Sequence, residues 1–417
     1  YSAVVNSVLE NPETYGNSDF GKGEKVMVEF VSANPTGPMH MGNARGGALG
    51  DCLAAVLDKA GYNAWREFYV NDAGNQIEKF GCSLEARYLQ IFKGDEIEFP
   101  EDGYQGEDIK DLAKEYADLN GDSLVNVSAE ERKKALVDYA LPKNIKKMQA
   151  DMEKYKIFYD KWFFESELHK SGAVKAVVDL LTEKGLTYEK DGAVWYKNKE
   201  VLTQKLLKEG KSQKYIDNLE LKDDVLIRQN GNPTYFTADI AYHKNKFDRG
   251  FTTLIDVWGA DHHGHVMRMK GAMDAIGYDG DKLNVVLMQL VKLVKDGELV
   301  RMSKRTGKAI QLGDLLDEVP VDSARFLFNT KEANTQMDFD LDLAVSQDNQ
   351  NPVYYVQYAH ARICSIFKSL AKEGISPREC TDAELALLTA PEEKELINHL
   401  ASYTNEIISA AKDYDPT

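Results

Sequence analysis

A histidine follows a proline- and glycine-rich loop at the point where an apolar strand gives way to a helix of small residues. The strand is predicted over residues 26–31, and the helix begins near His40. The first N–H groups of a helix lack partners within the helix, and the helix dipole is positive at that end. The order of strand, loop, histidine and helix therefore predicts a phosphate-binding site.

A second group with phosphate chemistry is the cationic loop Met302-Ser303-Lys304-Arg305-Thr306-Gly307-Lys308, which follows a predicted hairpin. Such a loop suits a clamp that closes on a triphosphate and neutralises charge in the transition state. A solvated basic surface loop is the alternative, and the loop alone does not decide between the two.

Three histidines lie close together at positions 262, 263 and 265. Neutral imidazole is a good zinc ligand, so a metal site is one interpretation. The segment lies where a strand ends and a helix begins, however, and nucleotides bind at such places in doubly wound sheets. We therefore predict no metal and place the histidines in a nucleotide and substrate pocket, with Gly259 allowing close approach. Gln289 either lines that pocket or pairs with a neighbouring strand.

The two phosphate-type motifs resemble the signature motifs of class I aminoacyl-tRNA synthetases. The first is His40-Met41-Gly42-Asn43, with Asn43 where the commonest form has a second histidine. The second is Arg301-Met302-Ser303-Lys304-Arg305, which departs from Lys-Met-Ser-Lys-Ser at its first and last positions. The resemblance implies that His40 and Lys304 stabilise the charge that develops during adenylation, and that Asn43 donates a hydrogen bond.

Further segments, at residues 69–77, 235–243, 258–265 and 351–362, resemble one member of that class, the arginyl-tRNA synthetases. The resemblance covers nearly the whole chain and is weakest over residues 85–155. It implies an arginine site of Glu29, Ser32, Asn34, Tyr235, Asp239 and His262. It implies an ATP site of His40, Gly42, Asn43, Gly259, Asp261, His262, Gln289, Met302, Ser303 and Lys304. Tyr358 and Arg362 are the tRNA contacts that it implies.

Arginine is a demanding ligand, because its guanidinium is planar, always charged and carries five donors. Carboxylates that meet it in plane bind it best. Tyr235 and Asp239 are four residues apart and share a face on a helix, although from the residues alone a helix cap or surface acid is the favoured interpretation of Asp239. Glu29 lies within an apolar strand, where a carboxylate needs a partner. A site built on such hydrogen bonds can reject a poor mimic by about 10⁴–10⁵-fold, which fits the absence of an obvious editing domain.

These side chains need a frame of strands and helices. A strand at 26–31, a helix at about 41–60 and a strand at about 63–70 make one βαβ unit, typical of a doubly wound parallel sheet. Further strands are predicted at 194–196, 225–227 and 253–258, and a hairpin with an Asp-Gly turn at 289–302. The predicted fold class is therefore α/β, with a doubly wound, parallel, Rossmann-like catalytic sheet and a following all-α bundle.

Residues 81–190 are predicted to be a mostly helical, charged insertion into the catalytic domain, which we place at 23–348. Ser128 and Glu131 form a capping box that opens a helix ending near Pro142, and helix continues over 144–155. Residues 1–22 are predicted to be the remnant of an N-terminal domain with a linker.

After residue 349 the pattern is entirely helical, with Pro352 at a first helical position. We predict that 349–417 is an incomplete anticodon-binding bundle. Tyr354, Tyr355 and Tyr358 could stack on RNA bases. Their spacing also suits packing between helices, which we favour for at least two of them.

Composition limits the class of protein. The 417 residues are too many for one ordinary core. A net charge of −17 excludes a general polyanion binder, so nucleic acid must be bound by a local basic surface or by shape. Four scattered cysteines indicate neither a disulfide framework nor a zinc knuckle. Without a long apolar run or a secretory leader, we expect a cytoplasmic protein with no membrane contact.

Together these features predict an arginine–tRNA ligase. It would form arginyl-adenylate and pyrophosphate from L-arginine and ATP, with Mg²⁺ on the phosphates, and then charge the 3′ end of tRNA(Arg). We expect a monomer, and, because the chain starts without Met and stops without a cap signal, a weakly active fragment cut at both ends. A catalytically silent synthetase-like binding module and another adenylyl-transferring enzyme of the same superfamily remain alternatives.

Overall fold

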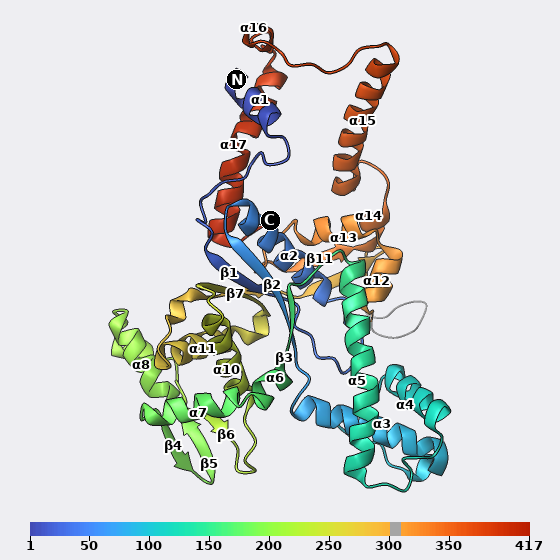
Figure 1. Ribbon diagram of the computed structural model, residues 1–417, viewed down its shortest axis with the longest axis vertical. Coiled ribbons are helices and arrows are strands. Elements are labelled where there is room, and N and C mark those ends of the chain that lie inside the picture. Colours follow the sequence, from blue (N-terminus) through green and yellow to red (C-terminus); the bar gives the residue numbers. More distant parts are fainter. Residues whose placement is uncertain (301–309) are drawn as a thin grey trace.

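A parallel sheet lies at the centre of the computed structural model, which describes residues 1–300 and 310–417 (Figure 1). Within these residues the sheet has five strands in the order β3-β2-β1-β7-β8. The chain runs outward from β1 to β3 and then returns to the other side of β1 at β7, so the strand order reverses between β1 and β7. This confirms the predicted doubly wound sheet, whose ligands bind at that switch point. The strands are β1 (Lys25–Glu29), β2 (Asn63–Val70), β3 (Lys161–Phe164), β7 (Thr253–Gly259) and β8 (Leu283–Met288).

Alternate residues of β1 face opposite sides of the sheet, as strand geometry requires. Val26 and Val28 join a core that includes helix α2 (Asn43–Lys59). Met27 joins the core on the other face, which includes α7 (Ala173–Glu183), α10 (Tyr235–Asp248) and α11 (His263–Ala275). By the same alternation, Glu29 lies on the side of α10.

Small residues let α2 approach the sheet closely. A Cβ added to Gly50 would lie 2.1 Å from the ring of Phe30, and one added to Gly47 would lie 2.9 Å from Ile157. The run of small residues predicted for this helix therefore has a packing role.

The insertion is shorter than predicted. Helices α3 (Asn75–Lys93), α4 (Glu107–Asn120) and α5 (Ala129–Lys154), with the 3₁₀ turn η1 (Gly94–Glu96), share a core of their own. The chain then returns to the central sheet at β3, so the predicted range 81–190 is wrong at its C-terminal end. Four residues are too few to show a strand period, which is why β3 escaped detection.

Helix α5 does not stop near Pro142 as predicted but runs through it. Leu136 and Ala140 pack in the core of the insertion, and Met148 and Met152 pack in the core beside the sheet. Burial of both halves outweighs the hydrogen bond that the proline removes.

The predicted strands at 194–196 and 225–227 are present but form a separate antiparallel sheet of β4, β5 and β6. It lies against the α7 and α10 side of the molecule (Figure 1). The elements of this region are α6 (Glu165–Lys170), β4 (Thr187–Lys190), β5 (Ala193–Tyr196), α8 (Asn198–Lys208), α9 (Gln213–Asp217) and β6 (Asp224–Ile227).

The predicted hairpin is confirmed as β9 (Val291–Lys295) and β10 (Glu298–Val300). Asp296 and Gly297 have φ of 53° and 75°, the left-handed pair that a two-residue turn of type I′ requires. Strand β11 (Met337–Asp340) pairs with β9 in parallel. The remaining elements here are η2 (Ala260–His262), η3 (Gly280–Lys282), α12 (Leu312–Glu318), α13 (Val321–Phe328) and α14 (Leu341–Val345).

The C-terminal region is helical, as predicted, and consists of α15 (Pro352–Lys372), α16 (Asp382–Leu385) and α17 (Pro391–Asp413). Helix α17 packs on α2 and on α1 (Ser2–Glu10), whereas α15 packs on α13 (Figure 1). Tyr355 and Tyr358 are 59% and 46% exposed. The packing between helices that we favoured is therefore not found for these two tyrosines.

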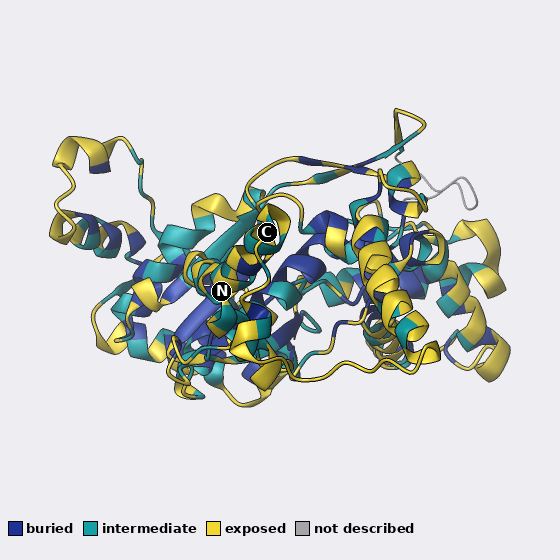
Figure 2. Ribbon diagram, turned by 90° about the horizontal axis from the view of Figure 1, so that it is seen from above, coloured by how far each residue is buried: buried dark blue, intermediate teal, exposed yellow. Residues whose placement is uncertain are grey.

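Burial follows this arrangement: buried residues concentrate in the central strands and the helix surfaces that face them (Figure 2). Among the described residues, no helix combines the length and apolarity that crossing a membrane requires.

Candidate active site

The predicted phosphate turn lies at the C-terminal side of β1, next to the switch point. The Gly42 N–H donates to Nδ1 of His40 at 3.1 Å, and α2 begins at Asn43. Partial burial lowers the pKa of His40, which keeps the imidazole neutral at neutral pH. Because Nδ1 accepts a hydrogen bond, the proton of the neutral ring lies on Nε2. His40 can therefore donate one hydrogen bond to a phosphate oxygen.

The chain that follows the cationic loop lies beside His40. Met41 N–H donates to the Ile310 carbonyl at 3.0 Å, and Leu312 N–H donates to the Met39 carbonyl at 2.9 Å. His40 and Gln311 form an antiparallel bridge between them. Residues Met302, Ser303 and Lys304 of the loop lie outside the described residues. Residues 310–312, which follow the cationic loop in the sequence, are thus hydrogen-bonded to the histidine turn.

A buried arginine ties the histidine helix to the end of the sheet. Arg45 is 0% exposed, and its guanidinium donates to four main-chain carbonyls. These belong to Gln289 (3.0 Å), Thr335 (2.9 Å), Lys331 (3.3 Å) and Glu332 (2.8 Å). The Gln289 N–H donates to Ala333, so its main chain pairs with a neighbouring segment, one of the two alternatives.

Three buried carboxylates lie side by side on neighbouring strands. Glu29 of β1 is in register with Glu67 of β2 and with Asp256 of β7. Residues in register on parallel strands face the same side, and like charges placed so are unfavourable without cations. We refer to Glu29, Glu67 and Asp256 as the carboxylate row.

Helix α10 and the residue after it supply the cations for this row. Lys246 bonds Glu29 Oε2 at 2.5 Å and Asp256 Oδ1 at 2.8 Å. Arg249 meets both oxygens of Glu67, at 2.6 and 2.8 Å. The sequence indicated that a carboxylate buried at Glu29 needs a partner, and Lys246 is that partner.

The charges of the row are strongly perturbed. Burial would raise the pKa of Asp256, but Lys246 and His243 outweigh it and lower that pKa to about 2. Burial raises the pKa of Glu29, and Lys246 opposes the shift. Asp256 is therefore ionised, while the ionised form of Glu29 depends on Lys246.

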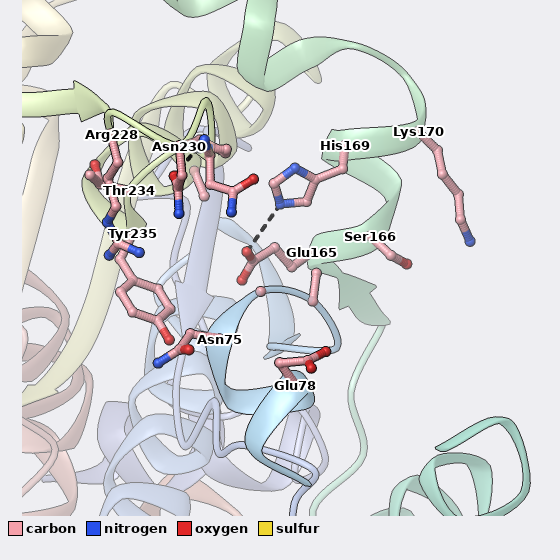
Figure 3. Close-up of a pocket in the computed structure, with 15 residues that line it drawn as sticks. Asn75, Glu78, Glu165, Ser166, His169, Lys170, Arg228, Asn230, Thr234 and Tyr235 are labelled. Atoms are coloured by element: carbon pink, nitrogen blue, oxygen red, sulfur yellow. Dashed lines mark hydrogen bonds and ion pairs between the residues drawn. The ribbon is translucent and has the colours of Figure 1, made fainter. Parts of the chain in front are cut away.

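A further buried acid, Glu165, opens onto a cavity of about 610 Å³ between α3, α6 and α10 (Figure 3). Tyr69 donates to Glu165 Oε2 at 2.9 Å, and His169 Nε2 lies 3.2 Å from Oε1. In the amide orientation that satisfies both its oxygen and its nitrogen, Asn71 donates to Glu165 Oε2 at 2.9 Å. Burial, together with the charge of Asp239, raises the pKa of Glu165.

Tyr235 and Asp239 lie on the first turns of α10, as their spacing predicted. Thr234 is the N-cap of this helix, so Asp239 is not a helix cap. Asp239 Oδ2 lies 3.0 Å from His265 Nε2, and Tyr235 lines the cavity with Glu165 (Figure 3). The negative charges of Glu165, Asp239 and Glu29 all act on Tyr69, raising its pKa together with burial. Of these three carboxylates, Glu165 is the one that hydrogen-bonds the Tyr69 hydroxyl.

The first loop turns back onto Glu29. Val31 and Ser32 have φ of 72° and 46°, a left-handed conformation that is strained for a β-branched residue. The turn lets Ser32 Oγ donate to Glu29 Oε1 at 2.8 Å and accept from the Tyr69 N–H at 3.1 Å. Asn34, two residues on, is exposed.

The three clustered histidines point to different places. His265 contacts Asp239, while His262 is mainly exposed, with Nε2 3.6 Å from Asp261 Oδ2. A Cβ at Gly259 would lie 2.5 Å from Asp261 Oδ1, so glycine fits there. In the part of the chain that the structure describes, the one group with metal-ligand spacing is Glu29, His243 and Asp256, and Lys246 bonds two of its members.

The implied tRNA contacts lie on α15, away from the cavity (Figure 1). Tyr358 stacks on Tyr354 with ring centroids 6.3 Å apart, and the Arg362 guanidinium lies 5.8 Å from the Tyr358 ring.

Sequence reasoning missed Glu165 and Lys246. Glu165 follows the four-residue strand that was also missed, although an acid directly after the aromatic run 162–164 was a usable signal. Lys246 lies one helical repeat beyond Asp239 (i+7) and could have been tested as a partner for Glu29.

A histidine turn at the switch point of a doubly wound sheet, joined to the chain after a cationic loop, defines a catalytic domain of the class I aminoacyl-tRNA synthetase type. The family model "tRNA synthetases class I (R), catalytic domain" matches residues 4–364, and "DALR anticodon binding domain" matches residues 356–417. The chain belongs to the arginyl-tRNA synthetases.

Individual relatives agree with the family models. An arginine–tRNA ligase of Ruminiclostridium cellulolyticum is 56% identical over 99% of this chain and 71% of its own length. One of Caldanaerobacter subterraneus subsp. tengcongensis is 58% identical over 96% of this chain and 68% of its own. A Campylobacter jejuni crystal structure with a provisional arginyl-tRNA synthetase assignment aligns with a TM-score of 0.79 and 34% identity, covering 99% of this chain and 87% of that one.

Proposed function

We propose that the chain activates L-arginine with ATP and then transfers the arginyl group to the 3′ end of tRNA(Arg). The family membership and the cavity beside Glu165 and Tyr235 support this proposal together. The single observation that carries the choice of substrate is a pair of carboxylates near the cavity: Glu165 lines it, and Asp239 lies one helical turn beyond Tyr235, which also lines it. A ligand with two separated cationic groups suits such a site, and arginine has a guanidinium and an α-ammonium group.

The orientation of arginine follows from the reaction. Its carboxylate must reach the α-phosphate of ATP, and the phosphate turn lies at His40 after β1. The α-carbon of arginine therefore lies near Glu29, Ser32 and Asn34, at the end of the same strand. The guanidinium then extends along α10 toward Tyr235 and Asp239, with Glu165 as a second carboxylate.

Activation needs little covalent work from the protein. A carboxylate oxygen of arginine attacks the α-phosphorus, the bond to the bridging oxygen breaks, and pyrophosphate leaves with that oxygen. Catalysis is then positioning plus charge stabilisation. The Nε2–H of His40 donates to a phosphate oxygen, the N-terminus of α2 favours negative charge, and Lys304 neutralises the departing phosphates.

The remaining ligands are proposed on the motif resemblance. Gly42, Asn43, Gly259, Asp261, His262, Gln289, Met302 and Ser303 would contact ATP. Mg²⁺ would enter with the ATP phosphates, since the described metal-ligand group already holds Lys246. Tyr358 and Arg362 would contact tRNA, and we propose a monomer that works in the cytoplasm.

The test is ATP–pyrophosphate exchange with each of the twenty amino acids, with and without tRNA(Arg). Exchange that responds to arginine alone would support the proposal, and its dependence on tRNA would show whether this chain still docks the nucleic acid. A chain that binds ATP but exchanges with no amino acid in either condition would favour the silent binding module.

A further inference from the structure

We propose that Lys246 is a positioning residue for arginine: its ammonium group holds the Glu29 carboxylate ionised and oriented toward the α-ammonium group of the substrate. The inference rests on the proposed function, in which Glu29 receives that end of arginine. Lys246 itself touches no substrate and acts through Glu29.

Both oxygens of Glu29 are fixed from opposite sides. Oε2 accepts from Lys246 at 2.5 Å, and Oε1 accepts from Ser32 at 2.8 Å. Lys246 is 0% exposed and also bonds Asp256, and its Nζ lies 4.4 Å from the centre of the Tyr242 ring. Its ammonium group is thus surrounded by two carboxylates and one aromatic face. Such a lysine has no freedom to swing away, so it fixes the plane of the Glu29 carboxylate.

The charges explain why Glu29 needs this lysine. His243 Nδ1 lies 2.7 Å from the Asp239 carbonyl, and Nε2 lies 2.6 Å from Asp256. Both partners of the ring are acceptors, so His243 is held by Asp256 and by the main chain of its own helix. Lys246 is the group that bonds both Glu29 and Asp256. His243 favours ionised Glu29 less than Lys246 does, so removal of Lys246 takes away the main cation beside Glu29.

Apart from Lys246, His243 is the charged group that favours ionised Glu29, and its ring is hydrogen-bonded to Asp256. Burial is the largest cause of its raised pKa, and Asp256 adds to that shift. Glu67, in register on β2, is paired with Arg249. Loss of Lys246 would therefore raise the pKa of Glu29 further and favour its protonated form. A protonated Glu29 cannot form an ion pair with an ammonium group.

A purely structural role for Lys246 is the competing explanation, since the ion pair also docks α10 on the sheet. The structure offers a matched control for it. Arg249, at the C-terminal end of the same helix, meets the same kind of buried strand glutamate, Glu67, and lies further along α10 from Asp239. If docking of α10 is what matters, breaking either the Lys246–Glu29 pair or the Arg249–Glu67 pair should have the same effect. If the ionised form of Glu29 is what matters, only the loss of Lys246 should have that effect.

The experiment measures binding by calorimetry to the whole chain, with two ligands that differ by one group. L-Arginine has the α-ammonium group, and 5-guanidinopentanoate lacks it. We expect Lys246→Met to lower the affinity for L-arginine at least tenfold and to change the affinity for 5-guanidinopentanoate less than twofold. Arg249→Met should leave the ratio of the two affinities unchanged. Raising the pH should strengthen L-arginine binding to Lys246→Met and leave the ratio of the two wild-type affinities unchanged.

If Lys246→Met loses affinity for both ligands equally, the inference is overturned and Lys246 has a structural role. Unchanged L-arginine binding would overturn it as well. If Lys246→Met does not fold, Lys246→Met/Asp256→Asn removes one cation and one carboxylate together, and the selective loss of L-arginine should persist there. Failure of the wild-type chain to bind L-arginine would overturn the proposed function and this inference with it, so the two failures are distinguishable.

Discussion

Replacing Asp239 with asparagine would remove one charge from the proposed arginine site while leaving its shape. The Asp239 Oδ2 lies 3.0 Å from His265 Nε2, and an amide oxygen can keep that hydrogen bond. Thr234 begins α10, so the helix start does not depend on Asp239. The substitution therefore isolates the attraction between one carboxylate and the guanidinium.

The size of the effect follows from the exposure of this side chain. Truncating one partner of a buried, hydrogen-bonded charge pair costs about 2–5 kcal/mol. The Asp239 side chain is 35% exposed in the free chain, so part of its charge is already solvated. We therefore expect the lower part of that range, about 2–3.5 kcal/mol, which corresponds to a loss of about 30- to 400-fold in kcat/KM for arginine.

The assay is arginine-dependent ATP–pyrophosphate exchange at saturating ATP. The KM for ATP should stay within about twofold, because Asp239 lies on α10 and not on the phosphate turn. Asp248→Asn is the matched control, since Asp248 is on the same helix and pairs with Lys244 at 2.6 Å near the surface. A loss below fivefold in Asp239→Asn, or an equal loss in the control, would refute the reasoning.

Three other predictions concern catalysis and stability. His40→Ala and Lys304→Ala should each lower the adenylation rate at least a hundredfold with little loss of fold, and single-turnover assays showing less than threefold for both would contradict the assignment. Arg45→Met should cost about 1–3 kcal/mol or more in urea unfolding, because it leaves buried carbonyls without a donor. A loss no larger than that of Arg378→Met, at an exposed pair, would contradict this. Burial raises the pKa of Asp256, but neighbouring cations lower it overall to about 2. Its contribution to stability is therefore present above about pH 4 and is lost as the pH falls toward 2. A urea midpoint that stays level from pH 5 to pH 2.5 would exclude this contribution.

The central sheet could be predicted because its signals are local. An apolar run, a loop and a helix of small residues identify the first βαβ unit within residues 25–70 without any long-range information. Strand β3 could not be found in this way, because Lys161–Phe164 is too short to show a period and is recognised as a strand only by pairing with β2. The course of α5 through Pro142 likewise depends on two separate cores that hold its halves.

The candidate site divides in the same way. His40, Tyr235 and Asp239 carry their chemistry in short motifs. Tyr235 and Asp239 lie one turn apart on α10, as their spacing predicted. The sequence indicated that Glu29 needs a partner but not which residue it is. Lys246 is distant in sequence and meets Glu29 only when α10 lies on the sheet. Glu165 was missed because its position depends on β3.

Stability alone gives no reason for the charges between α10 and the sheet. A buried ion pair costs several kcal/mol per ion in desolvation, and apolar residues of similar volume are often as stable or more so. Glu29 nevertheless lies in register with two other carboxylates, in the place where such charges are most costly. The proposed substrate gives that position a purpose, since its ammonium group needs an ionised acid as partner. A carboxylate stays ionised there when a fixed cation lies behind it. Lys246 supplies that cation from the helix whose first turns carry Tyr235 and Asp239, so the docking of α10 sets the distance between the two ends of the arginine site.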